Sequence, residues 1–438
     1  ALYLSEYDEY IKELMLRERV NFAPVRELKL DILRILFYED YDERDFKNFM
    51  EANRYWLDDY AIYNALKAAH NRAAWYDWEE EYRDRNSPHV EVFANKHRGE
   101  IRFYKFVQWI LYKQLLEVKS YAKQNGVLIM GDLPILASKD SADVWSYRQY
   151  FKTQYSAGAP PDMYSATGQK WGLPPYNWEA LRADDFIWWK KRLEYAQHFY
   201  DIFRLDHIIG FFRIYTIAED AQDATSGFYE PEDEKEWRKQ GEALLSMIID
   251  STDMLVVGED LGTVPKCCRE VMREFGIPGL KIERWERYYD GDGSFIDPSA
   301  YDPISVASLS THDSETLMGW WHKFPEDRAL YYKTIGYSGE PPEEMGTDIF
   351  MVCLSRIYNA SSIFVILGLW DILAIVPGVL KEDHEENRVN VPATVNEKNW
   401  TLRFNFYLEE VFGERFSDFN NTIRRLIEES GRASINKA

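Results

Sequence analysis

The feature that most constrains the fold is a change in sequence pattern at Gly126. Beyond it, six short apolar runs end in polar or charged residues, and helical or loop segments separate the runs. The runs are Val127–Asp132, Ile202–Asp206, Leu255–Glu259, Leu280–Arg284, Ser305–Asp313 and Ile363–Asp371. Strands that alternate with helices favour a parallel sheet of βα units. The sequence therefore predicts an α/β fold whose functional side chains lie at the carboxyl ends of the strands.

The residues that precede this sheet are predicted to be mainly helical. Segments 55–70 and 101–124 carry apolar residues at three- and four-residue spacings and contain neither Gly nor Pro. We expect a helical region at 1–125, a catalytic region at 126–410 and a helical tail at 411–438. Within the catalytic region we expect a long loop at 157–178 and an acidic insertion at 219–239.

Composition excludes some function classes. The net charge of −22 makes nucleic acids and anionic membranes poor partners, since both require a basic surface. Three cysteines, Cys267, Cys268 and Cys353, are too few for a disulfide framework and fit a reducing cytosol. The sequence shows no signal peptide and no basic amphipathic leader, so we expect a cytoplasmic protein.

One apolar stretch, SIFVILGLWDILAIVPGVL at 362–380, has the length that a bilayer requires. Asp371 lies in its middle, Pro377 lies near its end, and β-branched residues crowd its first half. A buried strand that runs into a helix is therefore the better interpretation.

Aromatic residues make up 16% of the chain. Most of them must build a core, but flat rings also stack on the apolar faces of sugars. The loop AGAPPDMYSATGQKWGLPPYNW at 157–178 combines such rings with Gly, Pro and amide residues. It is either a surface connection or a cover for a sugar-binding cleft.

Carboxylates follow several of the predicted strands. Arg204 and Asp206 face the same side of their strand, and the neighbouring positive charge favours an ionised nucleophile. A buried structural ion pair is the alternative. Glu259 closes an apolar strand, where loss of hydration raises a carboxyl pKa as a general acid requires. Asp260 beside it equally suits a helix N-cap. His312 and Asp313 end a further strand and can hydrogen-bond hydroxyls of a bound ligand.

Asp206, Glu259 and Asp313 are 53 and 54 residues apart and lie on successive or nearly successive strands. Retaining glycosyl transfer uses such a set as nucleophile, acid/base and stabilising carboxylate. A Mg²⁺ site also collects carboxylates at strand ends. The spacing alone leaves both interpretations open.

Seven segments resemble the 4-α-glucanotransferases of glycoside hydrolase family 77, the amylomaltases and disproportionating enzymes, in the order of that family. They are GDLPILASKDSADVW (131–145), AGAPPDMYSATGQKWGLPPYNW (157–178), RLDHIIGFFRIY (204–215), VGEDLGTVP (257–265), GIPGLKI (276–282), STHDSETLMGWW (310–321) and ENRVNVPATVNEKNW (386–400). RLDHIIGFFRIY and PPYNW look most like the plant cytosolic disproportionating-enzyme branch. The resemblance covers roughly residues 50 to 410.

The resemblance implies a (β/α)8-type barrel and a role for each matching residue. Asp206 would be the nucleophile, Glu259 the general acid/base and Asp313 the transition-state stabiliser. Arg204 and His312 would hold the donor sugar at the scissile bond. Further residues would line the sugar cleft: Asp132, Asn390, Asp162, Tyr164, Ser165 and Trp171. The family uses no metal and no cofactor, which the resemblance extends to this chain.

The sequence departs from the family pattern at its beginning. The six apolar runs would be barrel strands three to eight, and neither of the first two strands nor their loops is found. Unpaired edges would remain in such a sheet. The expectation is therefore that the chain is the carboxyl-terminal part of a longer enzyme and that an amino-terminal segment completes the barrel.

The function expected is transfer of a glucosyl or glucanosyl unit from an α-1,4-glucan to the 4-hydroxyl of an acceptor. The partners would be maltooligosaccharides, maltose, and glycogen or starch-like α-glucans. Two alternatives are a retaining α-glucan hydrolase of the amylase or glucosidase kind and a non-catalytic glucan-binding fragment.

Overall fold

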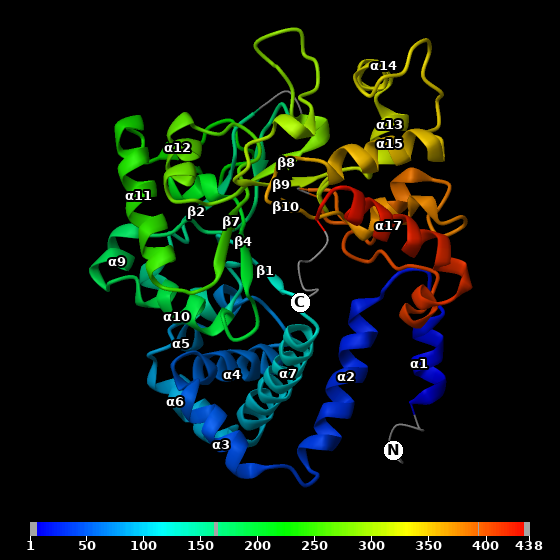
Figure 1. Ribbon diagram of the computed structural model, residues 1–438. Coiled ribbons are helices and arrows are strands. Elements are labelled where there is room, and N and C mark those ends of the chain that lie inside the picture. The colour runs from blue at the N-terminus through cyan, green and yellow to red at the C-terminus, as the bar shows by residue number, and fades with distance from the viewer. Residues whose placement is uncertain (1–6, 162–164, 393, 433–438) are drawn as a thin grey trace. The chain divides into compact units, whose positions relative to one another are not determined.

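The computed structural model describes residues 7–161, 165–392 and 394–432 (Figure 1). The chain divides into two compact units. One unit spans Glu27–Phe275, and the other combines Ala1–Arg26 with Gly276–Ala438. We call them the central unit and the terminal unit.

The central unit contains three parallel strands, β1 (Met130–Leu133), β4 (Ile202–Leu205) and β7 (Leu255–Gly258). They lie side by side with β4 in the middle (Figure 1). Asp132 is opposite Arg204, and Leu205 is opposite Gly258. All three strands were predicted, and the residues that follow them lie at one edge of the sheet.

An antiparallel sheet was not predicted. It consists of β2 (Tyr155–Ala159), β3 (Gln169–Lys170), β5 (Ile214–Ala218) and β6 (Phe228–Glu230), in the order β3-β2-β5-β6. Its strands are short, and β2 is rich in small residues that give no clear alternation. Gly158 is required here, because a Cβ at this position would lie 2.0 Å from the carbonyl oxygen of Gln169.

The helices of the central unit include the two predicted segments, 55–70 and 101–124, which form α4 and most of α7. Their inward faces pack Leu57, Phe106 and Trp109 against Phe46 and Phe49 of α3. The helices are α3 (Glu43–Ala52), α4 (Arg54–Ala69), α5 (Glu80–Arg83), α6 (Pro88–Lys96), α7 (Arg98–Gln124), α8 (Ala142–Ser146), α9 (Trp178–Ala183), α10 (Ile187–Ala196), α11 (Glu234–Asp250) and α12 (Lys266–Glu274), with 3-10 turns η1 (Trp75–Asp77), η2 (Arg148–Tyr150) and η3 (Ile208–Phe211). The acidic segment 219–239 thus carries β6 and the start of α11, with Trp237 buried.

The terminal unit contains the other three predicted strands, β8 (Gly279–Ile282), β9 (Ser305–Ser308) and β10 (Phe364–Val365). They are parallel, with β9 in the middle. Its helices are α1 (Asp8–Met15), α13 (Leu317–Lys323), α14 (Pro325–Thr334), α15 (Thr347–Tyr358), α16 (Leu369–Ile372) and α17 (Ser417–Glu429), with η4 (Glu283–Trp285), η5 (Pro298–Ala300), η6 (Leu373–Ile375), η7 (His384–Asn387), η8 (Leu408–Phe412) and η9 (Glu414–Phe416). α2 (Phe22–Phe37) extends across the division between the units.

The apolar stretch 362–380 is a strand followed by short helices, β10, α16 and η6. Asp371 at its centre is buried and accepts hydrogen bonds from the Ser310 hydroxyl and from the Leu317 N–H, the latter at 2.7 Å. Within the described part of the chain, no helix is long and apolar enough to cross a membrane.

Candidate active site

Arg204 organises the carboxylates at the ends of β1 and β4. Its Nη1 lies 2.9 Å from both oxygens of Asp132 and 3.0 Å from Oδ1 of Asp206. The parallel register places Arg204 opposite Asp132, and the alternation along the strand turns Arg204 and Asp206 to the same side. The arginine side chain is only 16% exposed, whereas that of Asp206 is 37% exposed. The partly buried cation thus fixes a carboxylate that solvent or substrate can reach.

Glu259 follows β7 and is held by backbone contacts to the end of β4. Its own N–H donates to the carbonyl of Leu205 at 3.0 Å, and its Oε2 accepts from the N–H of His207 at 2.8 Å. Burial raises the pKa of Glu259 to about 8, and the negative charge of Asp206 acts in the same direction. Arg204 and the His207 N–H oppose this effect without cancelling it. Glu259 is therefore protonated at neutral pH, as a general acid must be.

His207 joins this group, although the sequence analysis assigned it no role. Its backbone is left-handed, with φ of 45°, and this turn directs its N–H to Glu259. Burial, together with the charge of Arg213, lowers the pKa of His207 to about 4, so the ring is neutral. The only sequence signal was its position directly after Asp206.

The loop 157–178 reaches this group through Trp171. The Trp171 and His207 rings meet edge to face, with centroids 5.0 Å apart. Ser165 donates to the carbonyl of Gly168 at 2.7 Å and so closes a turn within the loop. Asp162 and Tyr164, which the sequence analysis placed in the cleft, lie outside the described residues.

The terminal unit assembles the remaining predicted residues. Asn390 Nδ2 donates to Oδ1 of Asp313 at 2.6 Å, and the Asn390 N–H donates to the carbonyl of His312 at 3.0 Å. His312 Nε2 lies 3.3 Å from Oδ2 of Asp313. The Trp400 ring, with its centroid 5.0 Å from that of His312, completes the group and was not predicted.

The predicted residues thus form two groups. Asp132, Arg204, Asp206, Glu259 and Trp171 belong to the group in the central unit. His312, Asp313 and Asn390 belong to the group in the terminal unit. In both, polar side chains follow parallel strands, which is where α/β enzymes place their active sites.

Comparison with solved structures defines the class of protein. The amylomaltase from Streptococcus agalactiae in complex with acarbose matches with a TM-score of 0.80 and 27% identity, over 94% of this chain and 80% of that one. The amylomaltase from Corynebacterium glutamicum, 20% identical, shows the same fold with a TM-score of 0.79 over 96% and 62% of the two chains. The predicted barrel-type α/β fold is confirmed.

Sequence comparison identifies the family. The model of the 4-alpha-glucanotransferase family, glycoside hydrolase family 77, matches residues 3–409, and the chain belongs to this family. A 4-alpha-glucanotransferase from Chlamydia pneumoniae is 38% identical over 421 residues, covering 95% of this chain and 78% of the relative. The rice enzyme 4-alpha-glucanotransferase DPE2 is 24% identical over 573 residues, covering 96% of this chain and 60% of the relative. Identity is thus higher to this bacterial relative than to the plant one.

Proposed function

We propose that this 4-α-glucanotransferase transfers glucosyl or glucanosyl units through a covalent intermediate on Asp206, with Glu259 as acid and then base. The observation that carries the proposal is the contrast between the two carboxyls. Arg204 stabilises the ionised form of Asp206, while burial keeps Glu259 protonated. Two carboxyl groups whose environments favour opposite protonation states are the requirement for retaining glycosyl transfer.

In the first step, an Asp206 oxygen attacks the anomeric carbon of the donor glucose. The α-1,4 bond breaks, and the proton of Glu259 passes to the departing 4-oxygen. In the second step, the Glu259 carboxylate takes the proton from the 4-hydroxyl of an acceptor sugar, whose oxygen attacks the same carbon and releases Asp206. Two inversions at one carbon retain the α configuration.

Asp313 would stabilise the positive charge that develops on the sugar, because it is fixed by Asn390 and flanked by His312. Arg204 and His312 would hold the donor sugar. Asp132 and Asn390 would line the cleft with the loop residues Asp162, Tyr164, Ser165 and Trp171. The contact between Trp171 and His207 supports this role for the loop.

The alternative Mg²⁺ interpretation of the carboxylates is disfavoured by Arg204. Its guanidinium lies within 3.0 Å of both Asp132 and Asp206 and already supplies the positive charge. A divalent cation there would face strong repulsion at short range.

The substrates we propose are maltooligosaccharides, maltose, and glycogen or starch-like α-glucans. The acarbose bound to the Streptococcus agalactiae amylomaltase supports a sugar-binding cleft. We also propose a cytoplasmic location, supported by the three free cysteines, since disulfides are rare in that compartment.

Incubation with maltotriose, with products resolved by chain length, tests the function. Wild-type protein should form glucose together with longer oligomers. Asp206→Asn and Glu259→Gln should each retain less than about a hundredth of this activity. Asp253→Asn, at an exposed position before β7, is the matched control and should retain full activity.

Other products contradict the proposal in distinct ways. Glucose and maltose without longer oligomers would identify a hydrolase. Saturable maltodextrin binding without turnover would identify a glucan-binding protein. Full activity in Asp206→Asn would show that the nucleophile is a different residue.

A further inference from the structure

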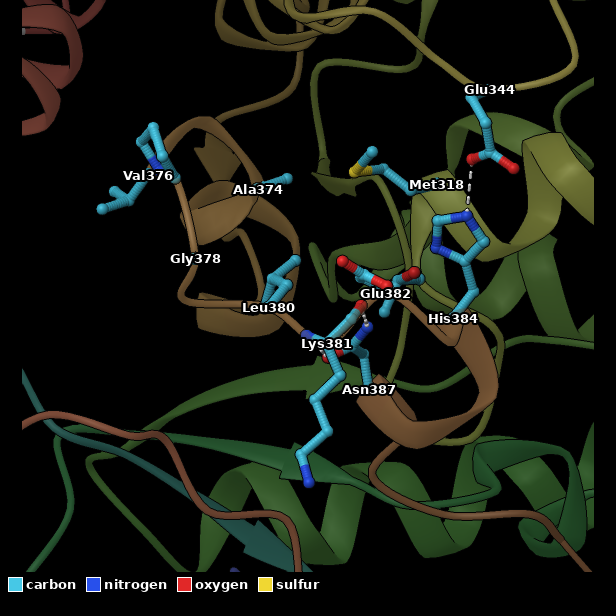
Figure 2. A pocket seen from close by; sticks show the side chains of 12 residues that line it. Met318, Glu344, Ala374, Val376, Gly378, Leu380, Lys381, Glu382, His384 and Asn387 are labelled. Carbon is cyan, nitrogen blue, oxygen red and sulfur yellow. Dashed lines mark hydrogen bonds and ion pairs between the residues drawn. The ribbon is translucent and has the colours of Figure 1, made fainter.

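His322, Glu344 and His384 meet at the surface of the terminal unit. Nδ1 of His322 lies 2.7 Å from Oε1 of Glu344, and Nε2 of His384 lies 2.8 Å from Oε2. One potential ligand atom from each residue lies within 4.8 Å of the other two. Among the described residues, this is the group of three or more His, Cys, Asp or Glu side chains that lie close enough together to hold a metal ion. Glu344 and His384 also line a pocket of about 460 Å³. Figure 2 shows the contact between these two side chains.

The helix that carries His322 is fixed at its beginning. Thr316 caps α13 by accepting the N–H of Gly319 at 3.0 Å. Gly319 also brings the helix close to η7, since a Cβ at this position would lie 3.4 Å from the Cβ of His384. The two histidines are therefore held near each other by backbone packing, and their ring centroids are 5.3 Å apart.

The segments that carry Glu344 and His384 are also anchored. Trp321 of α13 donates to the carbonyl of Pro342 at 3.0 Å, and Arg328 donates to the carbonyl of Glu343 at 3.0 Å. Buried Asn387 bridges the turn that contains His384, accepting from the Lys381 N–H at 2.9 Å and donating to its carbonyl at 2.8 Å. The three potential ligands thus come from three separate segments that converge on one point.

The donor set defines the kind of ion. Two imidazole nitrogens and a carboxylate oxygen suit first-row transition metals such as Zn²⁺, whereas Mg²⁺ and Ca²⁺ prefer oxygen ligands alone. Three protein ligands leave a fourth tetrahedral position for water, and Glu382 lines the same pocket (Figure 2). The side chains of His322 and Glu344 are 45% and 60% exposed, so an ion can reach the cluster from solvent.

The present distances are those of hydrogen bonds. Ligand atoms about 2.0–2.1 Å from a tetrahedral ion are roughly 3.3 Å from each other. Each ring nitrogen and the carboxylate oxygen that it now contacts would therefore move about half an ångström apart, while ligand atoms farther apart, within the 4.8 Å limit of the cluster, would move closer together. The exposed side chains of His322 and Glu344 have room for these movements, and the ion would replace the ring protons that now face the carboxylate.

We propose that His322, Glu344 and His384 form a binding site for a divalent first-row transition-metal ion of the zinc class. None of these residues belongs to the candidate active site. The family resemblance of the chain implies no metal at that site. The ion would link α13, the segment before α15 and η7. Asp313 precedes His322 by nine residues, and Asn390 follows His384 by six. The two segments that the ion would link are therefore also joined by the hydrogen bond from Asn390 to Asp313.

Metal titration of the tag-free full chain, after removal of metals with a chelator, tests the proposal. We expect one Zn²⁺ per chain by calorimetry, and Co²⁺ should give the visible absorption of a tetrahedral nitrogen and oxygen site. His322→Asn and His384→Asn should each weaken binding at least about tenfold, because loss of even an indirect partner of a metal ligand has effects of this size. Zn²⁺ should also raise the melting temperature of wild-type protein, since it binds only the folded chain.

His89→Asn is the matched control. His89 is an exposed histidine that lies 4.0 Å from Glu81, and this pair consists of one histidine and one carboxylate rather than two histidines and a carboxylate. It should bind Zn²⁺ as the wild type does. Unchanged maltotriose activity in the two test variants would show that they are folded. The proposal is wrong if wild-type protein binds neither Zn²⁺ nor Co²⁺, if His384→Asn binds them as tightly, or if millimolar Mg²⁺ displaces them.

Discussion

Glu259→Gln should abolish activity and yet stabilise the folded protein at alkaline pH. Glutamine has nearly the same shape as the protonated glutamic acid but cannot ionise. In the wild type, burial raises the pKa of Glu259 to about 8, above the ordinary value of 4.5. The folded state therefore holds a proton that the unfolded chain has released, and wild-type stability falls as the pH rises from 4.5 to 8.

The size of the effect follows from the two pKa values. Each pH unit between them contributes about 1.36 kcal/mol, which gives an upper limit of about 5 kcal/mol for the whole range. Between pH 6 and pH 9 the upper limit is about 2.7 kcal/mol, because the wild-type side chain ionises near pH 8. Water penetration and local relaxation reduce such energies, so we expect the glutamine variant to gain about 1–2 kcal/mol relative to wild type over this interval.

Urea unfolding at pH 6 and pH 9, followed by tryptophan fluorescence, measures the change. Glu117→Gln, at an exposed position on α7, is the matched control, and its stability difference from wild type should be the same at both pH values. The wild-type kcat/KM should also fall about tenfold per pH unit above pH 8, as Glu259 loses the proton it must donate. A glutamine variant that gains no stability between pH 6 and pH 9 would refute the raised pKa and, with it, the acid role assigned to this residue.

Two further substitutions test the candidate site, and a third tests the ion pairs of Glu386. Arg204→Met should lower kcat by about 10²–10³. It should also move the alkaline limb of the kcat/KM profile above pH 8, because the arginine charge lowers the pKa of Glu259. An alkaline limb that stays in place would contradict this coupling. Asn390→Ala keeps the backbone hydrogen bond to His312 but removes the side-chain amide that donates to Asp313. This variant should lower kcat/KM at least about tenfold in steady-state assays. An unchanged kcat/KM would show that Asn390 does not position Asp313. Lys398 and Arg19 lower the pKa of Glu386 to about 2. Because solvent screens these pairs, Glu386→Gln should cost only about 1 kcal/mol in urea unfolding at pH 7, and the loss should shrink as the pH falls from 4.5 toward 2. A loss that stays constant with pH would show that the ion pairs are not its cause.

The parallel strands could be predicted because each lies within or beside a short apolar run that ends in a polar or charged residue. Their limits were less predictable. β9 ends at Ser308 rather than continuing to Asp313, and β10 contains only Phe364 and Val365. Beyond Ser308 the chain turns, with the Ser314 N–H donating to the carbonyl of Thr311. Periodicity reports which residues are buried, but hydrogen bonding to neighbouring strands decides where a strand ends.

The antiparallel sheet could not be predicted, because its strands are paired by contacts between distant parts of the sequence. β2 has the sequence YSAGA, and its main partner β5 lies about sixty residues later in the chain. The close packing that requires Gly158 depends on the carbonyl of Gln169, which no local pattern reveals. Likewise, the acidic composition of 219–239 concealed the pairing of Phe228–Glu230 with β5.

In the candidate site, too, some features could be predicted from local sequence and others depend on tertiary contacts. Residue types and positions were predictable, because Asp206 and Glu259 follow apolar strands whose ends meet at one edge of a sheet. The direction of each protonation state was also predicted, from Arg204 beside Asp206 and from the apolar strand that Glu259 closes. The contacts made by other parts of the fold were not predicted, such as the Asp132 carboxylate that also binds Arg204. The N–H of His207 contacts Glu259 only because its backbone adopts a left-handed conformation. Sequence thus predicts which carboxyl would attack and which would donate the proton, and the structure supplies the surroundings that support these proposed roles, Arg204 beside Asp206 and burial around Glu259.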